Sequence, residues 1–111
     1  MFALIGYLMR ELLASGTSLI VEGNFNRATL FEGLPEAGIV QIHVSAAPEV
    51  LRARMLERDT HRHPVHYDRE AADEVPARAQ AGEWDAIPLS GKLVRIDTTI
   101  WPDLENVLAS I

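Results

Sequence analysis

The sequence predicts an α/β fold: a three-layer arrangement in which a parallel sheet is flanked by helices, in one domain over residues 1–111. Three short apolar segments, 18–23, 39–44 and 92–97, have the composition of buried strands. Helical patterns separate them, and strands that alternate with helices favour a parallel sheet with crossover connections. A chain of 111 residues can bury one core. Three strands are few for this class, which indicates that part of the sheet is missing.

The helices are predicted from apolar spacing and from the residues at their ends. Apolar residues at three- and four-residue steps predict an amphipathic helix that starts at Phe2 and stops before Gly16. A helix is also expected from Asp68 to about residue 75, because Pro76 should break or kink it. The other predicted helices are 27–36, 48–58 and 102–111. Loops are expected over 60–67 and over 82–91, the latter anchored by Trp84.

Composition excludes several classes of function. The formal net charge is -6, whereas a general nucleic-acid binder shows a basic face. The chain has no Cys, so disulfides, Cys-based zinc sites and thiol catalysis are excluded, and a cytoplasmic location is expected. The apolar run 2–9 is interrupted by Arg10 and Glu11, well short of the ~20 residues that a membrane span needs. No membrane and no nucleic acid are expected as partners.

Ligands of open parallel sheets bind beyond the carboxyl ends of the strands, which points to 22–25, 44–46 and 97–99. Glu22 is the notable residue there, since a carboxylate that ends an apolar strand can hold a hydrated magnesium ion or accept a proton. Gly23 would let a substrate approach the backbone closely. The simpler interpretation, which spacing alone favours, is an ordinary glutamate in solvent.

Arginine and histidine gather in the second half of the chain. Arg54 and Arg58 share a helix face and Arg62 follows, an arrangement that suits phosphate binding or an ordinary solvated face paired with carboxylates. His61, His63 and His66, with Asp68, have the donors of a zinc site but the spacing of a loop, so a polar loop is favoured and no metal site is predicted.

A phosphate-binding loop of the pattern G-x-x-x-x-G-K-[ST] is absent from the sequence. The only lysine, Lys92, follows Gly91, but Ala86 occupies the position of the first glycine and Leu93 that of the Ser/Thr. Lys92 also begins a predicted strand rather than a helix.

Several segments together nevertheless resemble a known family. The stretches SLIVEGNF, VQIHVSAAPEVLRARMLERD, HRHPVHYD and KLVRIDTT, in this order, resemble the C-terminal two-thirds of small P-loop kinases. The nearest group is the AAA-type ATP-binding domain of the predicted kinases, related to zeta toxin and chloramphenicol phosphotransferase. The resemblance implies an incomplete P-loop kinase-like fold, in which the family's phosphate-loop strand would lie between 18–23 and 39–44. That gap must close, be filled by a second chain, or stay open.

The resemblance also implies roles for individual residues. Glu22 would assist magnesium or activate the acceptor hydroxyl. Arg58 and Arg62 match lid arginines that clamp the ATP phosphates. The remaining matches are binding residues: Asn24 and Phe25 in the acceptor pocket, His63 and His66 in the lid, and Asp97 and Thr98 beside the adenine pocket.

The implied function is that of an ATP-dependent small-molecule kinase in its complete form, with ATP and Mg²⁺ as cofactors and a small-molecule phosphate acceptor. This chain would be a truncated, inactive portion, with a missing N-terminal segment or a second copy of itself as partner. Two alternatives stay open: a non-catalytic remnant that binds a protein through an exposed sheet edge, and a weak free-standing nucleotide binder.

Overall fold

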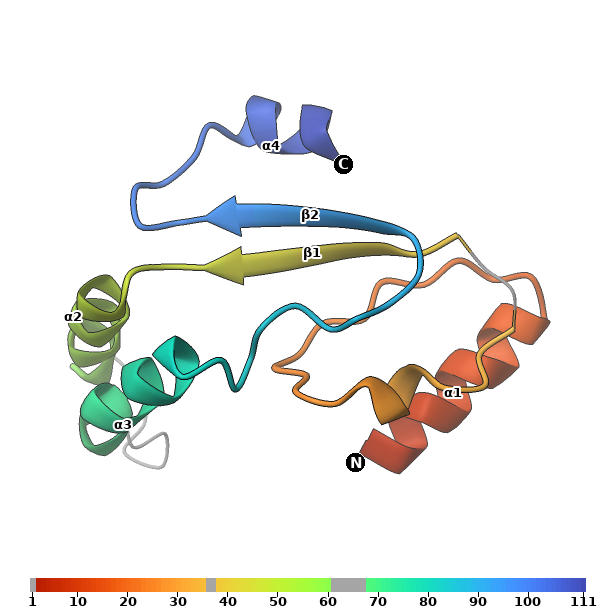
Figure 1. Cartoon of the computed structure of the whole chain (residues 1–111), viewed down its shortest axis with the longest axis horizontal. Coiled ribbons are helices and arrows are strands. Elements are labelled where there is room, and N and C mark those ends of the chain that lie inside the picture. The colour runs from red at the N-terminus through yellow and green to blue at the C-terminus, as the bar shows by residue number, and fades with distance from the viewer. Residues whose placement is uncertain (1, 36–37, 61–67) are drawn as a thin grey trace.

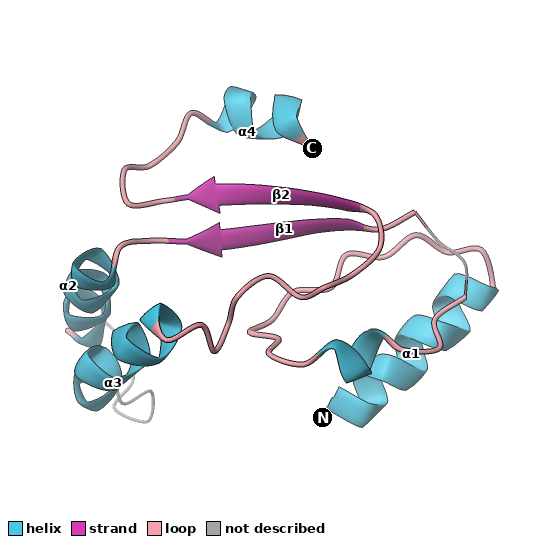
Figure 2. Ribbon diagram, viewed as in Figure 1, coloured by secondary structure: helices cyan, strands magenta, loops and turns pink. Residues whose placement is uncertain are grey.

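The structure, a computed structural model, describes residues 2–35, 38–60 and 68–111. They form a mixed α/β fold with four α-helices and a two-stranded parallel sheet (Figure 2). The elements in chain order are α1 (Phe2–Ala14), the 3-10 helix η1 (Ala28–Phe31), β1 (Val40–Ser45), α2 (Pro48–Asp59), α3 (Asp68–Gln80), β2 (Lys92–Asp97) and α4 (Leu104–Ser110).

The two strands pair in parallel, as predicted, with Val40 opposite Lys92 and Ser45 opposite Asp97. The crossover between them consists of α2 and α3, which pack against each other. Gly91 lets the chain pass close to Ile39 just before the two strands begin to pair. Its φ is +108°, and a Cβ there would lie 2.3 Å from the carbonyl oxygen of Ile39. Only glycine avoids both the backbone strain and this collision.

The predicted strand at 18–23 is not formed. Residues 17–22 carry no regular secondary structure, and the side chain of Ile20 is fully exposed. A strand exists only when its backbone pairs with a neighbour, and this segment is separated from the edge of β1 by a cavity. The apolar composition of 18–23 therefore wrongly indicated a third strand in the sheet.

Two helices begin and end where the sequence predicts. Gly16, with φ +84°, ends α1, and two hydrogen bonds close the turn: Thr17 N to Leu12 O and Gly16 N to Leu13 O, both 3.0 Å. This is the Schellman arrangement, in which glycine adopts the left-handed conformation. Pro48 is the first residue of α2, where its missing N–H is no loss.

Three helices differ from the prediction. The helix expected over 27–36 is one short turn, η1, because Gly33, with φ +70°, leads the chain away. Pro76 does not stop α3, which continues to Gln80 and is closed by Gly82 at φ +92°. Pro76 has no N–H to donate within the helix, but the packing of α3 against α2 keeps the helix continuous through this position. The last helix, α4, starts after Asp103, whose carboxylate accepts from the Glu105 N–H at 2.9 Å.

The helices surround the sheet without enclosing it. In Figure 1 the α2–α3 pair lies at the arrowhead end of the strands, α1 and η1 lie on the opposite side of the molecule, and α4 lies beyond β2. The buried apolar residues of the described chain are Met9, Met55, Ala72 and Val94. Within this part of the chain no helix is long and apolar enough to cross a bilayer.

Candidate functional site

The carboxyl ends of the two strands are tied together by Thr98, which is only 8% exposed. Its N–H and its hydroxyl both donate to the Ser45 carbonyl, at 2.7 and 2.9 Å. Arg54 reaches the same residue from α2: Nη1 donates to the Thr98 hydroxyl at 3.1 Å and Nη2 donates to the Thr98 carbonyl. The Arg54 guanidinium also lies 4.3 Å from the centre of the Trp101 ring. This contact set fixes a helix against the end of the sheet.

Asp97 closes the turn that follows β2. Its carboxylate accepts from the Thr99 hydroxyl at 2.6 Å and from the Thr99 N–H at 2.8 Å. These two bonds, the hydroxyl first, hold the pKa of Asp97 below its ordinary value. The Thr99 hydroxyl in turn accepts from the Ala47 N–H at 2.8 Å, at the start of α2. Asp97 and Thr98, expected to lie beside a nucleotide base, thus have structural partners in the turn.

A cavity of about 680 Å³ lies between the extended segment and the sheet. Residues 19–25 line one side and residues 38–44 the other, so the predicted residues Glu22, Asn24 and Phe25 all border it. Glu22 and Asn24 are exposed, whereas Phe25 is half-buried with its ring centre 5.4 Å from Phe31. The structure therefore gathers the acceptor-side residues around one space, with Glu22 supplying an acidic group.

Phe25 also borders a second cavity of about 580 Å³, between α1 and η1. Its lining combines the aromatic ring of Phe2 with two cations, Arg10 and Arg27. The Phe2 and Phe25 ring centres are 6.1 Å apart. The sequence pattern does not predict that Arg10 and Arg27 share a cavity. They are seventeen positions apart in the chain and line the same cavity only after folding.

The predicted lid residues divide into those the structure describes and those it does not. Arg58 is exposed in the last turn of α2. Arg62, His63 and His66 lie outside the described residues. The arginine that reaches the strand ends is Arg54, one helical turn before Arg58.

Polar side chains of β1 hold the segment that precedes β2. The Gln41 side-chain amide donates to the Ile87 carbonyl at 2.8 Å and accepts from the Ile87 N–H at 2.7 Å. It therefore satisfies both backbone groups of Ile87, as a neighbouring strand would. His43 Nε2 lies 2.8 Å from the Trp84 carbonyl, and because a carbonyl only accepts, the imidazole donates. The residues before β2 are thereby fixed beside the cavity.

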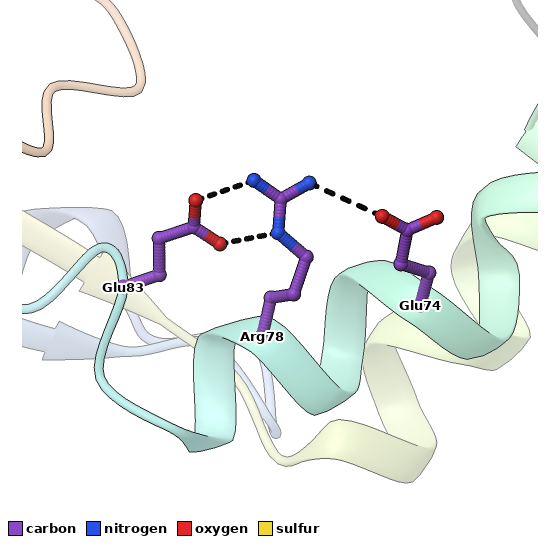
Figure 3. Close-up of polar contacts among 3 residues, drawn as sticks. All are labelled: Glu74, Arg78 and Glu83. Carbon is purple, nitrogen blue, oxygen red and sulfur yellow. Dashed lines mark hydrogen bonds and ion pairs between the residues drawn. The ribbon is translucent and has the colours of Figure 1, made fainter.

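Arg78 secures the same segment to α3, as Figure 3 shows. Its guanidinium binds both oxygens of Glu83 and lies 3.4 Å from a Glu74 oxygen. The hydrogen bond from Arg78 lowers the pKa of Glu83, while Glu83 raises that of Arg78. The Arg78 guanidinium also lies 5.0 Å from the centre of the Trp84 ring. Trp84 thus anchors the loop 82–91 to α3, in line with the role predicted for it from the sequence.

Within residues 2–35, 38–60 and 68–111, no three His, Asp or Glu side chains gather into a metal-type cluster. No protein-family model, curated protein or solved structure matches the chain.

Proposed function

We propose that this chain forms the acceptor and lid portion of an ATP-dependent small-molecule kinase, whose phosphate loop comes from a segment that this sequence does not contain. The observation that carries the proposal is the cavity that Glu22, Asn24 and Phe25 share with β1. It lies between two extended segments, where the family resemblance puts a third strand and its phosphate loop. The three-layer parallel sheet predicted from the sequence belongs to this completed form.

The lining of the cavity fits part of this role. The lining carries two carboxylates, Glu22 and Asp85. A carboxylate such as that of Glu22 suits Mg²⁺, which usually keeps several waters and takes its other ligands from substrate phosphates. When bound, ATP with Mg²⁺ would supply the phosphoryl group. Lys and Arg are absent from the described lining, so the charge of a triphosphate needs cations from elsewhere. In this proposal they come from the added segment and from Arg58 and Arg62.

The proposal predicts that the chain alone has no measurable ATP-dependent phosphotransfer, since losing even one electrostatic group commonly costs on the order of 100-fold in rate. The test measures ATP turnover, with water as acceptor, for the chain alone and for the chain co-expressed with a strand–GxxxxGKS–helix segment. Turnover only in the co-expressed form supports the proposal. Robust turnover by the chain alone contradicts it.

Two substitutions sharpen this test in the co-expressed form. Glu22→Gln should remove most of the turnover, whereas Glu32→Gln, an exposed glutamate outside the cavity lining, should leave it unchanged. Arg58→Ala should weaken binding of a fluorescent ATP analogue while the melting temperature stays constant, because exposed substitutions usually change stability by less than about 0.5 kcal/mol. A large drop in melting temperature with unchanged affinity would identify Arg58 as a structural residue.

A second candidate function is a non-catalytic interaction module that binds a protein through the free edge of β1. The specific observation in its favour is the apolar surface of β1: Val40, Ile42 and Val44 are 49%, 45% and 60% exposed. Absence of nucleotide binding in the co-expressed form, together with stable association of the two segments, would select this function over the first.

A further inference from the structure

We infer that the cavity between α1 and η1, called the arginine cavity below, binds a small organic anion with a flat apolar body, such as an aromatic carboxylate, between Arg10 and Arg27. This cavity is separate from the one beside β1 on which the proposed function rests. Binding there requires neither ATP nor an added segment, so the anion site and the proposed function can fail independently.

The lining of the arginine cavity is positively charged. Arg10 comes from α1 and Arg27 directly precedes η1, while the described lining contains no Asp or Glu. The whole chain has a formal net charge of -6, so two cations without a carboxylate are unusual for its composition. Within the residues that the structure describes, neither of these two guanidinium groups is paired with a carboxylate. Like charges that share one cavity repel each other, and a bound anion reduces that repulsion.

Gly6 makes room for the head group of Arg10 at the cavity. Gly6 is buried, and a Cβ there would lie 3.4 Å from Arg10 Nη1 and 3.4 Å from Leu30 Cδ1. Residues four apart share a helix face, and long side chains of a helix point back toward its N-terminus. The Arg10 guanidinium therefore lies over Gly6, on the side of α1 that faces Leu30 of η1.

The polar side chains of the lining favour a ligand group that only accepts hydrogen bonds. A guanidinium has five N–H donors and no acceptor, and it binds carboxylate or phosphate oxygens through paired donors. Asn26 and Thr29 border the same cavity and are exposed, so an amide and a hydroxyl can add further donors. A carboxylate, which accepts at two oxygens, matches this set.

Two aromatic rings favour a flat apolar body on the same ligand. The ring of Phe25 is fixed from two sides: Phe31 meets it edge to face, with ring centres 5.4 Å apart, and a Cβ on Gly23 would lie 2.9 Å from its Cζ. Phe2 lies 6.1 Å from Phe25 between ring centres and is 53% exposed. A flat ring that covers Phe2 beside the fixed Phe25 buries apolar area in stacked or edge-to-face geometry.

The size of the arginine cavity suits a small molecule. Its volume of about 580 Å³ falls within the range of roughly 300–1,000 Å³ that is typical of small-molecule sites. Such sites combine an apolar and aromatic lining with a few polar groups that orient the ligand. The arginine cavity has both parts.

The test titrates 2-naphthoate into the full chain and follows the fluorescence of the ligand. The neutral amide 2-naphthamide is the matched ligand, because it has the same ring system without the charge. We expect saturable binding of the naphthoate, and binding of the amide that is at least about tenfold weaker, because the hydrogen bonds to a charged group are lost. Equal affinities for the two ligands overturn the inference.

Three arginine variants assign the charge effect to the cavity. Arg10→Met and Arg27→Met should each weaken naphthoate binding at least about threefold and change naphthamide binding little, because methionine keeps an apolar stem without the charge. Arg95→Met is the matched control: Arg95 is exposed on β2, outside the cavity, and the variant should bind naphthoate like the unmodified chain. Equal weakening in all three variants overturns the inference, because it assigns the effect to net charge.

Nuclear Overhauser effects locate the bound ring. The ring protons of naphthoate should show them to the methyl groups of Ala3 and Leu30, which line the arginine cavity. Effects to Ile20 and Ile42 instead would place the ligand in the cavity beside β1 and overturn the assignment. Effects confined to exposed apolar residues such as Leu104 would overturn it as well.

Discussion

At the scale of single residues, Arg54 joins α2 to the carboxyl end of the sheet. Its two terminal nitrogens satisfy the hydroxyl and the carbonyl of Thr98, while its planar face lies on Trp101. Thr98 is only 8% exposed, so leaving its polar groups without a partner would cost stability. Arg54 therefore has a structural role at the end of the sheet where a ligand-binding role had been expected for its neighbours.

We predict that Arg54→Met destabilises the chain by about 1–3 kcal/mol, the range for hydrogen bonds to charged groups plus a cation–π contact. The matched control is Arg52→Met, which removes an exposed ion pair of 2.6 Å with Asp73 and should cost at most about 1 kcal/mol. Urea unfolding of both variants gives the comparison. Equal losses would show that the Thr98 contacts contribute no more than a surface ion pair.

Asp97 makes the stability of the strand end depend on pH. Because its pKa is lower in the folded chain than in the unfolded chain, its carboxylate contributes stability above the ordinary carboxyl range, and this contribution is lost as the pH falls through the lowered pKa. We predict that the unmodified chain is more stable than Asp97→Asn at neutral pH. The difference should shrink progressively below about pH 4.

Comparison with the variant at each pH isolates Asp97, since the lowered pKa of Glu83 affects both proteins in the same direction. Thermal unfolding at a series of pH values measures the effect. A stability difference that stays constant down to strongly acidic pH would contradict the assignment, because it would place the contribution of residue 97 outside its ionisation.

At the scale of elements, the start of the sheet depends on a glycine. Gly91 combines a positive φ with a backbone carbonyl 2.3 Å from where a Cβ would lie, whereas Gly16, with φ +84°, has open space around it. Gly16→Ala should cost about 1–2 kcal/mol, the price of a left-handed backbone. Gly91→Ala should cost about 3 kcal/mol or more, because Ile39 must also move and the first β1–β2 hydrogen bond is strained. Urea unfolding of the two variants measures this difference, and equal effects would rule out the collision.

The elements that the sequence predicts correctly are those whose signals are local. Gly16 and Pro48 mark the end of α1 and the start of α2 through their own backbone preferences. The pattern 18–23 is equally apolar, but whether extended backbone becomes a strand depends on a neighbour that local sequence does not specify. Pro76 fails as a stop signal for a similar reason, because the packing of α3 against α2 outweighs the lost donor.

In the candidate site, too, residues that are close in sequence were predictable, whereas contacts between distant residues were not. Glu22, Asn24 and Phe25 are consecutive or nearly so, and one loop carries them all to the cavity. The contact between Arg54 and Thr98 joins residues 44 positions apart, and the bonds of Gln41 to Ile87 span 46. Such pairs have no spacing rule in sequence, since the crossover between β1 and β2 sets them side by side.

At the scale of the whole molecule, the chain is more open than its length requires. Its radius of gyration is 16.2 Å, whereas a compact domain of 111 residues has about 13 Å. Large apolar side chains are exposed on α1, β1 and the C-terminal segment, among them Leu4, Val44 and Trp101. The openness lies in the arrangement of elements, because each helix and the strand pair are themselves regular.

This openness predicts a weak response to denaturant. An unfolded chain of 12.3 kDa exposes about 17,800 Å², so folding to 8380 Å² buries about 9,500 Å², against about 11,700 Å² for a compact monomer. The urea m-value scales with the surface exposed on unfolding, so it should be about four-fifths of the value for a compact domain of this length.

An m-value already typical of a compact domain, measured on a monomer, would contradict the argument. It would mean that the apolar surfaces of α1, β1 and the C-terminal segment meet within one chain in solution, and that the chain needs no partner to cover them.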